Sequence, residues 1–287
     1  MTHWKLGVIG GSGLYELDEL TNQQWLEIGS PWGEPSSPVL SGQISGVDVV
    51  FLPRHGLGHT IAPSAINARA NIDVLKRAGC TDIVSVSAVG SLQAHLPPGS
   101  FAIVDQFIDW TRGRPGSFFD GGLVAHVSMA DPVCPRLASL ASQAAHSLNI
   151  PHVTRATYLA MEGPQFSSRV ESLLYRSWGC DVIGMTAMPE ARLAREAELP
   201  YASICMVTDY DSWREDEAGV DVSGVLEVMH ANAAAGKALI AELVRQLPEV
   251  REASPIDTCL DMAVVGDPAN GDARLAAILS RRLAAAQ

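Results

Sequence analysis

The sequence Leu6-Gly-Val-Ile-Gly-Gly-Ser-Gly-Leu14 places four glycines in and after a short apolar run near the start of the chain. Leu6–Ile9 has the length and composition of a buried strand. Glycines at a strand end let backbone N–H groups converge on an anion, and Ser12 adds a hydroxyl donor. A dinucleotide fingerprint begins in the same way, but no clean G-x-G-x-x-G opens a helix here. The motif predicts either a phosphate-binding strand end or a tight turn without a ligand, and it fits nicotinamide binding less well.

Further apolar, β-branched runs follow this first one, and stretches with helical spacing lie between several of them. The expected strands are Val47–Leu52, Ile83–Val86, Phe101–Val104, Thr157–Met161, Val182–Met185 and Ala202–Val207. The expected helices are Ser64–Ala78, Pro135–Leu148, Ser167–Trp178, Pro189–Glu198 and Val222–Leu247. Strands that alternate with helices predict an α/β fold, in which helices cover a central sheet on both faces.

The domain organisation follows from composition along the chain. Residues 1–247 show no compositional shift, so we expect one domain there. Pro248–Pro255 is rich in Pro, Glu and Ser and is typical of a linker. Beyond it, Asp272 can cap a final helix over Ala273–Ala285. The sequence therefore predicts a C-terminal extension, 248–287, that ends in a helix.

Charge and cysteine usage exclude several classes of protein. The net charge is −12, from 32 acidic and 20 basic residues, so we expect no nucleic-acid binding, and any bound anion needs a local site. No apolar stretch is long enough for a transmembrane helix, and the first residues lack the pattern of a signal peptide. The five cysteines are dispersed and never spaced as C-x-x-C, which argues against a zinc site and a disulfide scaffold. We expect a cytoplasmic protein with no membrane partner and no metal.

Two clusters that could bind an anion follow expected strands. Arg54 and His55 lie at the end of the expected strand Val47–Leu52, and an arginine at a strand's carboxyl end can pair with an oxyanion where α/β sheets hold ligands. The alternative is a surface ion pair with a capping histidine. Ser87 and Ala88 lie in a run of small residues, which either let a ligand approach the backbone or simply end a strand.

Two further clusters suit a planar base and a proton transfer. Phe166 follows a Gly-Pro turn and can stack on a flat ring, or it is a core residue beside Ser167, which we expect to begin a helix. Asp209 and Asp211 close the last strand, where each carboxylate raises the pKa of the other and partial burial raises it further. A proton held there can be given to a leaving group, although an exposed Asx turn is the alternative. Because all these clusters sit at strand carboxyl ends, we expect them to form one site.

In chain order, these motifs resemble those of the trimeric purine nucleoside phosphorylases. The residues that carry the resemblance are Gly10-Gly-Ser-Gly-Leu14, Arg54-His-Gly56 with His59, Asn67 with Ala70-Asn-Ile72, Glu162-Gly-Pro164, Phe166-Ser167, Met185-Thr186 with Pro189-Glu190, and Thr208-Asp-Tyr-Asp211. The likeness runs from about Trp4 to about Leu247. It implies a nucleoside phosphorylase fold, a mixed and twisted sheet flanked by helices, and a homotrimer. It also implies phosphorolysis of 5′-methylthioadenosine to adenine and 5-methylthioribose 1-phosphate, with phosphate as co-substrate and no cofactor.

The resemblance also implies roles for single residues. Phosphate is held by Ser12, Arg54, His55, Ser87, the Ala88 backbone and Thr186. Met185 lies against the ribose, Phe166 and Ser167 border the base, and Asp209 faces the purine with Thr208 and Asp211 in support. We expect Asp209, Asp211 and His55 to be the catalytic residues.

The 5′ end of the nucleoside is expected to meet two further groups of residues. Phosphorylases of ordinary nucleosides carry a histidine in the segment after Asp211, where this chain has none before His230. Val222, Val225 and Leu226 instead share one helix face, which favours an apolar methylthio group. His126 aligns with a family position that reaches across the subunit interface, so we expect it to border the neighbour's 5′ pocket.

Two other functions stay open at this point. The function nearer to the one implied above is that of a sister phosphorylase acting on methylthioinosine, adenosine, inosine or guanosine. A site for a 6-oxopurine needs a hydrogen-bond donor toward O6, where this chain has Asp209. The other is a non-catalytic protein that binds a nucleoside or a nicotinamide and has kept the fold.

Overall fold

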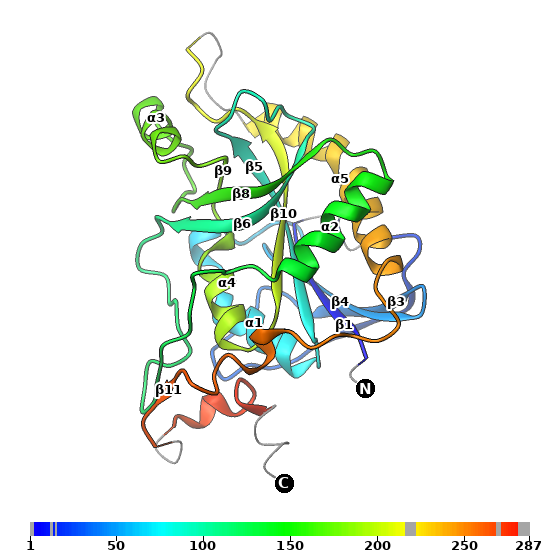
Figure 1. Cartoon of the computed structure of the whole chain (residues 1–287), viewed down its shortest axis with the longest axis vertical. Helices are drawn as coiled ribbons and strands as arrows, with labels where there is room; N and C mark the ends of the chain where they lie inside the picture. Colours follow the sequence, from blue (N-terminus) through cyan, green and yellow to red (C-terminus); the bar gives the residue numbers. More distant parts are fainter. Residues whose placement is uncertain (1–2, 12–13, 15, 216–221, 268–270, 281–287) are drawn as a thin grey trace.

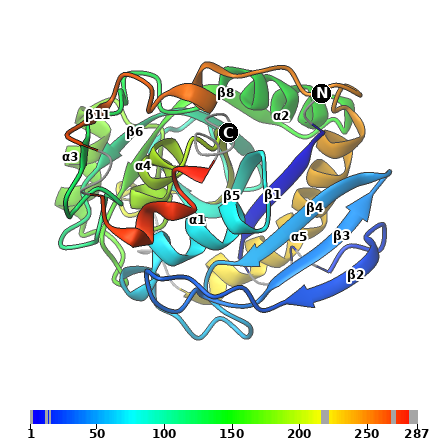
Figure 2. The ribbon, with the colours of Figure 1, turned by 90° about the horizontal axis from the view of Figure 1, so that it is seen from below.

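The fold is built on a mixed, twisted sheet of nine strands (Figures 1 and 2). The computed structural model describes residues 3–11, 14, 16–215, 222–267 and 271–280, but not the side chains of residues 222–227 and 229–231. The strands are β1 (Lys5–Gly10), β2 (Thr21–Leu26), β3 (Val39–Ile44), β4 (Val47–Pro53), β5 (Asp82–Ser91), β6 (Phe101–Asp109), β8 (His152–Ala160), β9 (Val182–Gly184) and β10 (Tyr201–Asp209). The order is β10-β6-β8-β9-β5-β1-β4-β3-β2, and β10 also pairs with β5, so five strands close into a ring.

All seven expected strands form, which confirms the α/β prediction. Two strands of this sheet, β2 and β3, were missed, because β2 gives a weak signal in the sequence. β2 reads Thr-Asn-Gln-Gln-Trp-Leu and is almost wholly exposed at the sheet edge, so it lacks the apolar run of a buried strand. A smaller sheet pairs β7 (Val124–Ala125) with β11 (Val264–Val265).

Helices cover both faces of the sheet, as the alternation predicted. They are α1 (Ala68–Arg77), α2 (Pro135–Ser147), α3 (Arg169–Ser177), α4 (Ala187–Glu196) and α5 (Val222–Arg245). α1 packs with α4, and α2 packs with α5, so each pair closes one apolar core against the sheet (Figure 2). Among the described helices, none is both long and apolar enough to cross a membrane.

The N-terminus of α3 lies one residue later than predicted. Ser168, and not Ser167, caps this helix, because the Ser168 side chain accepts the Glu171 N–H while Glu171 accepts the Ser168 N–H. This capping box satisfies two backbone donors at once. Ser167 is thereby released from the helix terminus and is buried against Met161, with its hydroxyl 3.7 Å from the sulfur.

The segment predicted as a linker is packed against the domain. Arg251 is buried and pairs with Asp82 and Asp257, and Trp4 donates to the Pro248 carbonyl. Arg251 ties this segment to the domain, but most of its other residues are exposed, so its role as a linker stays a prediction. The placement of a domain boundary at residue 247 stays a prediction.

The C-terminal extension follows the predicted pattern only in part. Asp272 caps a helical turn as expected, accepting the Arg274 N–H at 2.9 Å, but that turn is a short 3-10 helix, Ala273–Ala276. The part of the predicted terminal helix beyond residue 280 lies outside the described residues.

Candidate active site

A cavity of about 610 Å³ lies where the strand ends of the ring meet β4. β1, β4, β5 and β10 run in the same direction, so their carboxyl ends share one edge of the sheet. β9 runs the opposite way to β5 and pairs Ile183 with Gly90 at this edge. A slightly larger cavity, of about 700 Å³, opens between α2, β6 and β8, but it gathers none of the predicted site residues.

Most of the predicted site residues line the first cavity together. They are Arg54, His55, Ser87, Ala88, Phe166, Met185, Thr186, Thr208, Asp209 and Asp211. The anion-binding candidates and the base-binding candidates therefore share one space, as the sequence predicted.

The remaining predicted residues fall into three groups. Ser167 is buried next to the cavity but does not line it. His126 is exposed beside β7 and does not line the cavity within one chain. Ser12, together with the side chains of Val222, Val225 and Leu226, lies outside the described residues.

Arg54 is fully buried, with 1% of its surface exposed, and most of its donors are already engaged. Nε donates to Glu190 at 2.9 Å, and Nη2 donates to Ser85 Oγ at 2.6 Å and to Glu190 at 3.2 Å. Nη1 donates to the Val86 carbonyl at 2.9 Å. A guanidinium has five N–H groups, so within the described residues one on Nη1 is left for a ligand. The bidentate pairing with an oxyanion that the sequence predicted is taken up by Glu190.

Glu190 was quoted in the sequence only as part of a motif, and its role was missed. It is 2% exposed and also accepts the Tyr201 hydroxyl at 2.8 Å. Burial alone would lower the pKa of Arg54, but the Glu190 carboxylate raises it above its ordinary value. The signal that could have revealed Glu190 is an acid at the start of a helix, where the residues on its own helix face, such as Leu193 and Ala194, are apolar.

His55 lines the cavity with its ring stacked on His59, at 4.3 Å between centroids. Its Nδ1 lies 2.9 Å from the Ile61 carbonyl. A carbonyl can only accept, so Nδ1 carries the hydrogen. Burial lowers the pKa of His55 to about 4, and the nearby Arg54 lowers it as well. At neutral pH the ring is therefore uncharged.

Asp209 and Asp211 form a buried turn at the end of β10. Asp209 accepts the Thr208 hydroxyl at 2.8 Å and the Asp211 backbone N–H at 2.7 Å. Burial raises the pKa of Asp209 despite these two bonds, and burial also raises the pKa of Asp211. The pKa of each carboxyl is raised in the predicted direction, but burial is the main cause, and only Asp211 is affected by the charge of its neighbour. Asp209 and Asp211 do form the Asx turn that was the alternative interpretation, but this turn is buried and not exposed.

Met185 is positioned by contacts behind the cavity wall. Arg114 donates to the Met185 carbonyl at 2.6 Å and to the Glu162 carbonyl at 2.6 Å, so it joins two loops that border the site. Gly163 lies so close to Met185 that a Cβ at this position would collide with the Met185 sulfur. Within the described parts of the chain, no three His, Cys, Asp or Glu side chains are grouped so that they could hold a metal ion.

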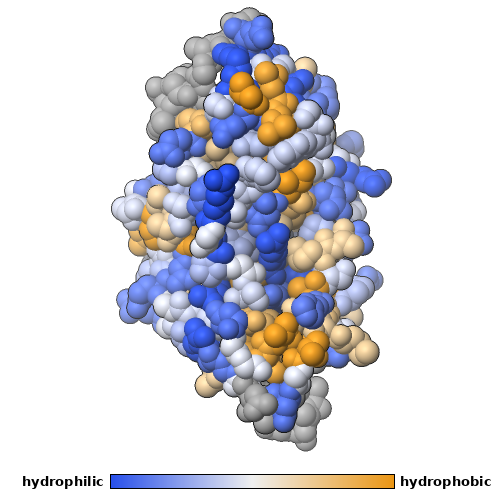
Figure 3. Space-filling model, turned by 90° about the vertical axis from the view of Figure 1, so that its left-hand side faces the viewer, coloured by the Kyte–Doolittle hydropathy of each residue, from blue (hydrophilic) through white to orange (hydrophobic). Residues whose placement is uncertain are grey.

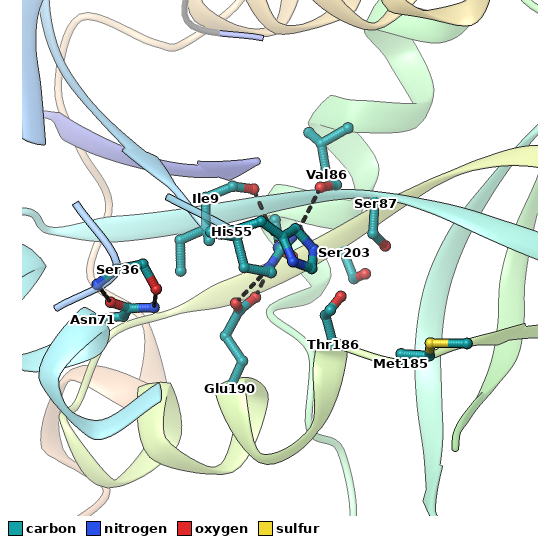
Figure 4. A network of polar contacts seen from close by, with 12 residues as sticks. Ile9, Ser36, His55, Asn71, Val86, Ser87, Met185, Thr186, Glu190 and Ser203 are labelled. Atoms are coloured by element: carbon teal, nitrogen blue, oxygen red, sulfur yellow. Dashed lines mark hydrogen bonds and ion pairs between the residues drawn. The ribbon is translucent and has the colours of Figure 1, made fainter. Parts of the chain in front are cut away.

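The arrangement suits an anion next to a planar, apolar molecule. The side chains of Ser87 and Thr186 lie near His55 around one space (Figure 4), and Phe166, Met185 and the protonatable Asp209 line the same cavity. An anionic nucleophile and a leaving group that needs a proton can be held in this one cavity.

Comparison with known proteins agrees with this geometry. The chain is 51% identical over 276 residues to S-methyl-5′-thioadenosine phosphorylase of Cereibacter sphaeroides, covering 96% of this chain and 95% of that protein. It is also 51% identical to the phosphorylase of the same name from Bradyrhizobium diazoefficiens, with the same coverage. A methylthioadenosine phosphorylase from an Antarctic soil metagenomic library superposes with a TM-score of 0.92 at 44% identity, covering 97% of this chain and 100% of that one. Residues 5–245 match the phosphorylase superfamily, and the chain therefore belongs to that family.

Proposed function

We propose that this protein catalyses the phosphorolysis of 5′-methylthioadenosine to adenine and 5-methylthioribose 1-phosphate. The observation that carries the proposal is one cavity that joins the anion-binding cluster around Arg54 to the raised-pKa carboxyl of Asp209. The named relatives that cover almost the whole chain act on the same nucleoside according to their names, which supports the choice of substrate.

In this reaction a phosphate oxygen forms a bond to C1′ of the ribose while the bond from C1′ to N9 of adenine breaks. The electron pair of the broken bond goes to the purine, which takes up a proton at N7. Asp209 can hold that proton because burial favours its neutral form. The ribose gains positive charge in the transition state, and the neighbouring phosphate stabilises it.

The proposed contacts divide the cavity into three parts. Ser12, Arg54, His55, Ser87, Ala88 and Thr186 bind phosphate, with Met185 against the ribose. Phe166, Ser167, Thr208, Asp209 and Asp211 surround the base. A carboxylic group suits the 6-amino group of adenine, whereas a 6-oxopurine needs a donor at that place. The methylthio group lies against Val222, Val225 and Leu226.

We further propose a homotrimer, because two apolar patches lie on one face of the chain. The α3 patch consists of the exposed side chains Trp110, Val170, Leu173, Leu174 and Trp178, and the β7–β11 patch of Val124, Met262 and Val265. Figure 3 shows an upper and a lower apolar region on this face, separated by polar residues. Two different patches favour a head-to-tail contact between subunits, and such a contact gives a closed trimer when each step rotates the next subunit by a third of a turn. His126 adjoins the second patch, so a neighbour docked on α3 would bring it toward Phe166.

The decisive experiment is release of adenine from methylthioadenosine with and without phosphate. Release that depends on phosphate is expected, and methylthioinosine measured in parallel should be a much poorer substrate. Release of adenine without phosphate, or no release at all, would contradict the proposal.

Analytical ultracentrifugation tests the proposed trimer, which a fully active monomer would exclude. Independence of a cofactor and a cytoplasmic location stay predictions.

A further inference from the structure

We infer that His55 recognises phosphate through the hydrogen that phosphate itself carries, so that the site selects hydrogenphosphate and hydrogenarsenate over sulfate. The inference rests on the proposed function, because it concerns the co-substrate of that reaction. It adds a specificity-determining role to a residue that the sequence predicted to bind the anion and to be catalytic.

The tautomer of His55 follows from its backbone partner. The Ile61 carbonyl is 2.9 Å from Nδ1 and cannot donate, so the ring hydrogen is on Nδ1. The other ring nitrogen, Nε2, then has a lone pair and no hydrogen. The ring borders the cavity beside Ser87 and Thr186, and Figure 4 shows these three side chains gathered around the same space. An anion placed there meets an acceptor at His55.

The charged groups around His55 keep the ring neutral. His59 is stacked on the His55 ring, and both Arg54 and His59 disfavour a positive charge on that ring. Glu190 favours a charge, but its carboxylate is already paired with Arg54. Burial disfavours the charged ring most, so the pKa falls to about 4.

The same ion pair cancels the charge that would otherwise attract any dianion. Arg54 and Glu190 are both buried and joined by two hydrogen bonds, so together they present no net charge to the cavity. Binding then depends on how donors and acceptors match. Hydrogenphosphate offers one O–H to Nε2 and its other oxygens to the donors of Arg54, Ser87, Thr186 and the Ala88 backbone. Sulfate has no hydrogen at neutral pH, so one of its oxygens faces the Nε2 lone pair.

The test is calorimetric titration of the wild-type protein with phosphate, arsenate and sulfate at about pH 7.5. We expect phosphate and arsenate to bind at least about tenfold more tightly than sulfate, which corresponds to about 1.4 kcal/mol. Histidine side-chain ¹⁵N spectra should show Nδ1 protonated and Nε2 unprotonated in the free protein. Equal affinity for phosphate and sulfate, or a hydrogen on Nε2, would overturn the inference.

A variant sharpens the comparison. His55→Gln provides an amide that can donate, so the preference for phosphate over sulfate should narrow to less than about threefold. His95→Gln, which changes an exposed histidine, should keep the wild-type preference. If His55→Gln does not fold, the wild-type titrations and spectra still decide. Base release that needs phosphate, combined with tight sulfate binding, would refute this inference alone, whereas base release without phosphate would refute the proposed function.

Discussion

Glu190 holds the guanidinium of Arg54 through two hydrogen bonds, of 2.9 Å to Nε and 3.2 Å to Nη2, although the two residues are 136 positions apart. Both side chains are buried, and Tyr201 donates a third hydrogen bond to the carboxylate. The pair therefore determines which N–H of Arg54 faces the cavity. Glu190 acts through Arg54 and is a positioning residue.

We expect Glu190→Gln to weaken both the fold and the binding of phosphate. The amide keeps the size of the side chain but turns one acceptor into a donor that faces Arg54, and breaking a buried ion pair costs about 3–5 kcal/mol. Urea denaturation should show this loss, and the KM for phosphate should rise more than kcat falls. Glu190→Asp, which keeps the charge, should recover part of both. Glu249→Gln is the matched control, because Glu249 is exposed. Wild-type stability and KM in Glu190→Gln would show that the pair does not position Arg54.

Asp209→Asn should cripple turnover of methylthioadenosine while the protein stays folded. An amide cannot deliver a proton to N7, and a positioned general acid contributes about 10²–10⁴-fold to the rate. The amide can instead donate to O6, so the ratio of kcat/KM for methylthioinosine to that for methylthioadenosine should rise. Initial rates on the two nucleosides at saturating phosphate measure both effects. An unchanged rate and an unchanged preference would remove Asp209 from the reaction.

Local patterns in the sequence could predict much of the site, because its residues come in short runs at strand ends. Arg54 with His55 and Asp209 with Asp211 lie at the ends of β4 and β10, whereas Ser87 and Ala88 lie within β5, which continues to Ser91 beyond the predicted strand end. Parallel strands bring such runs to one edge of a sheet, so these patterns suffice to predict a shared cavity there. The resemblance to a family then assigned roles that the patterns alone left open.

Pairings between distant segments could not be predicted in the same way. Arg251 reads as part of a linker until Asp82, 169 positions away, is placed beside it. The closing of the ring by β10 and β5 and the pairing of Glu190 with Arg54 likewise depend on tertiary contact. The β2 strand is polar because it lies at an exposed edge, so it carries no apolar signal.

Gly90 is the position where a single methyl group should disturb the base-binding part of the site. A Cβ at this position would lie 2.8 Å from Oδ1 of Asp209 and 3.1 Å from Ile183. Gly90→Ala should therefore displace the carboxylate, and a misplacement of about 1 Å can cost about 10²-fold in rate. We expect kcat to fall by about 10–100-fold, with a smaller change in the KM for phosphate. Gly29→Ala is the control, because a Cβ there meets open space. A wild-type kcat in Gly90→Ala would mean that Asp209 needs no exact placement.

The 5′ substituent is tested at Val222, at the start of α5. An apolar pocket favours a methylthio group by about 1–3 kcal/mol but rejects a hydroxyl only about 10²-fold, so adenosine should be a poor yet detectable substrate. Val222→His should help adenosine and hurt methylthioadenosine, which narrows the ratio of their kcat/KM values. Val250→His, at an exposed position, should leave the ratio unchanged. If both substrates respond equally to Val222→His, then Val222 belongs to the helix core and not to the pocket.

Asp211 should make the stability of the protein depend on pH in a direction opposite to that of most carboxylates. Burial raises the pKa of Asp211 above its ordinary value of 3.8. Between the ordinary pKa, which the unfolded chain keeps, and the raised pKa of the folded protein, the folded protein holds a proton that the unfolded chain has released. The free energy of unfolding therefore falls as pH rises through this window. Asn cannot ionise, and it tolerates the left-handed backbone at this position, where φ is 51°.

Asp211→Asn should therefore gain stability relative to the wild type when the pH is raised from about 4 to about 7.5. Urea denaturation at both pH values measures this change, and taking the difference between them cancels the constant cost of losing a carboxylate oxygen. Asp18→Asn, at an exposed carboxyl, should show no such gain. The free energy of unfolding of Asp211→Asn relative to the wild type could instead be unchanged between the two pH values, or could fall as pH rises. Either result would mean that Asp211 is ionised in the folded protein throughout this range.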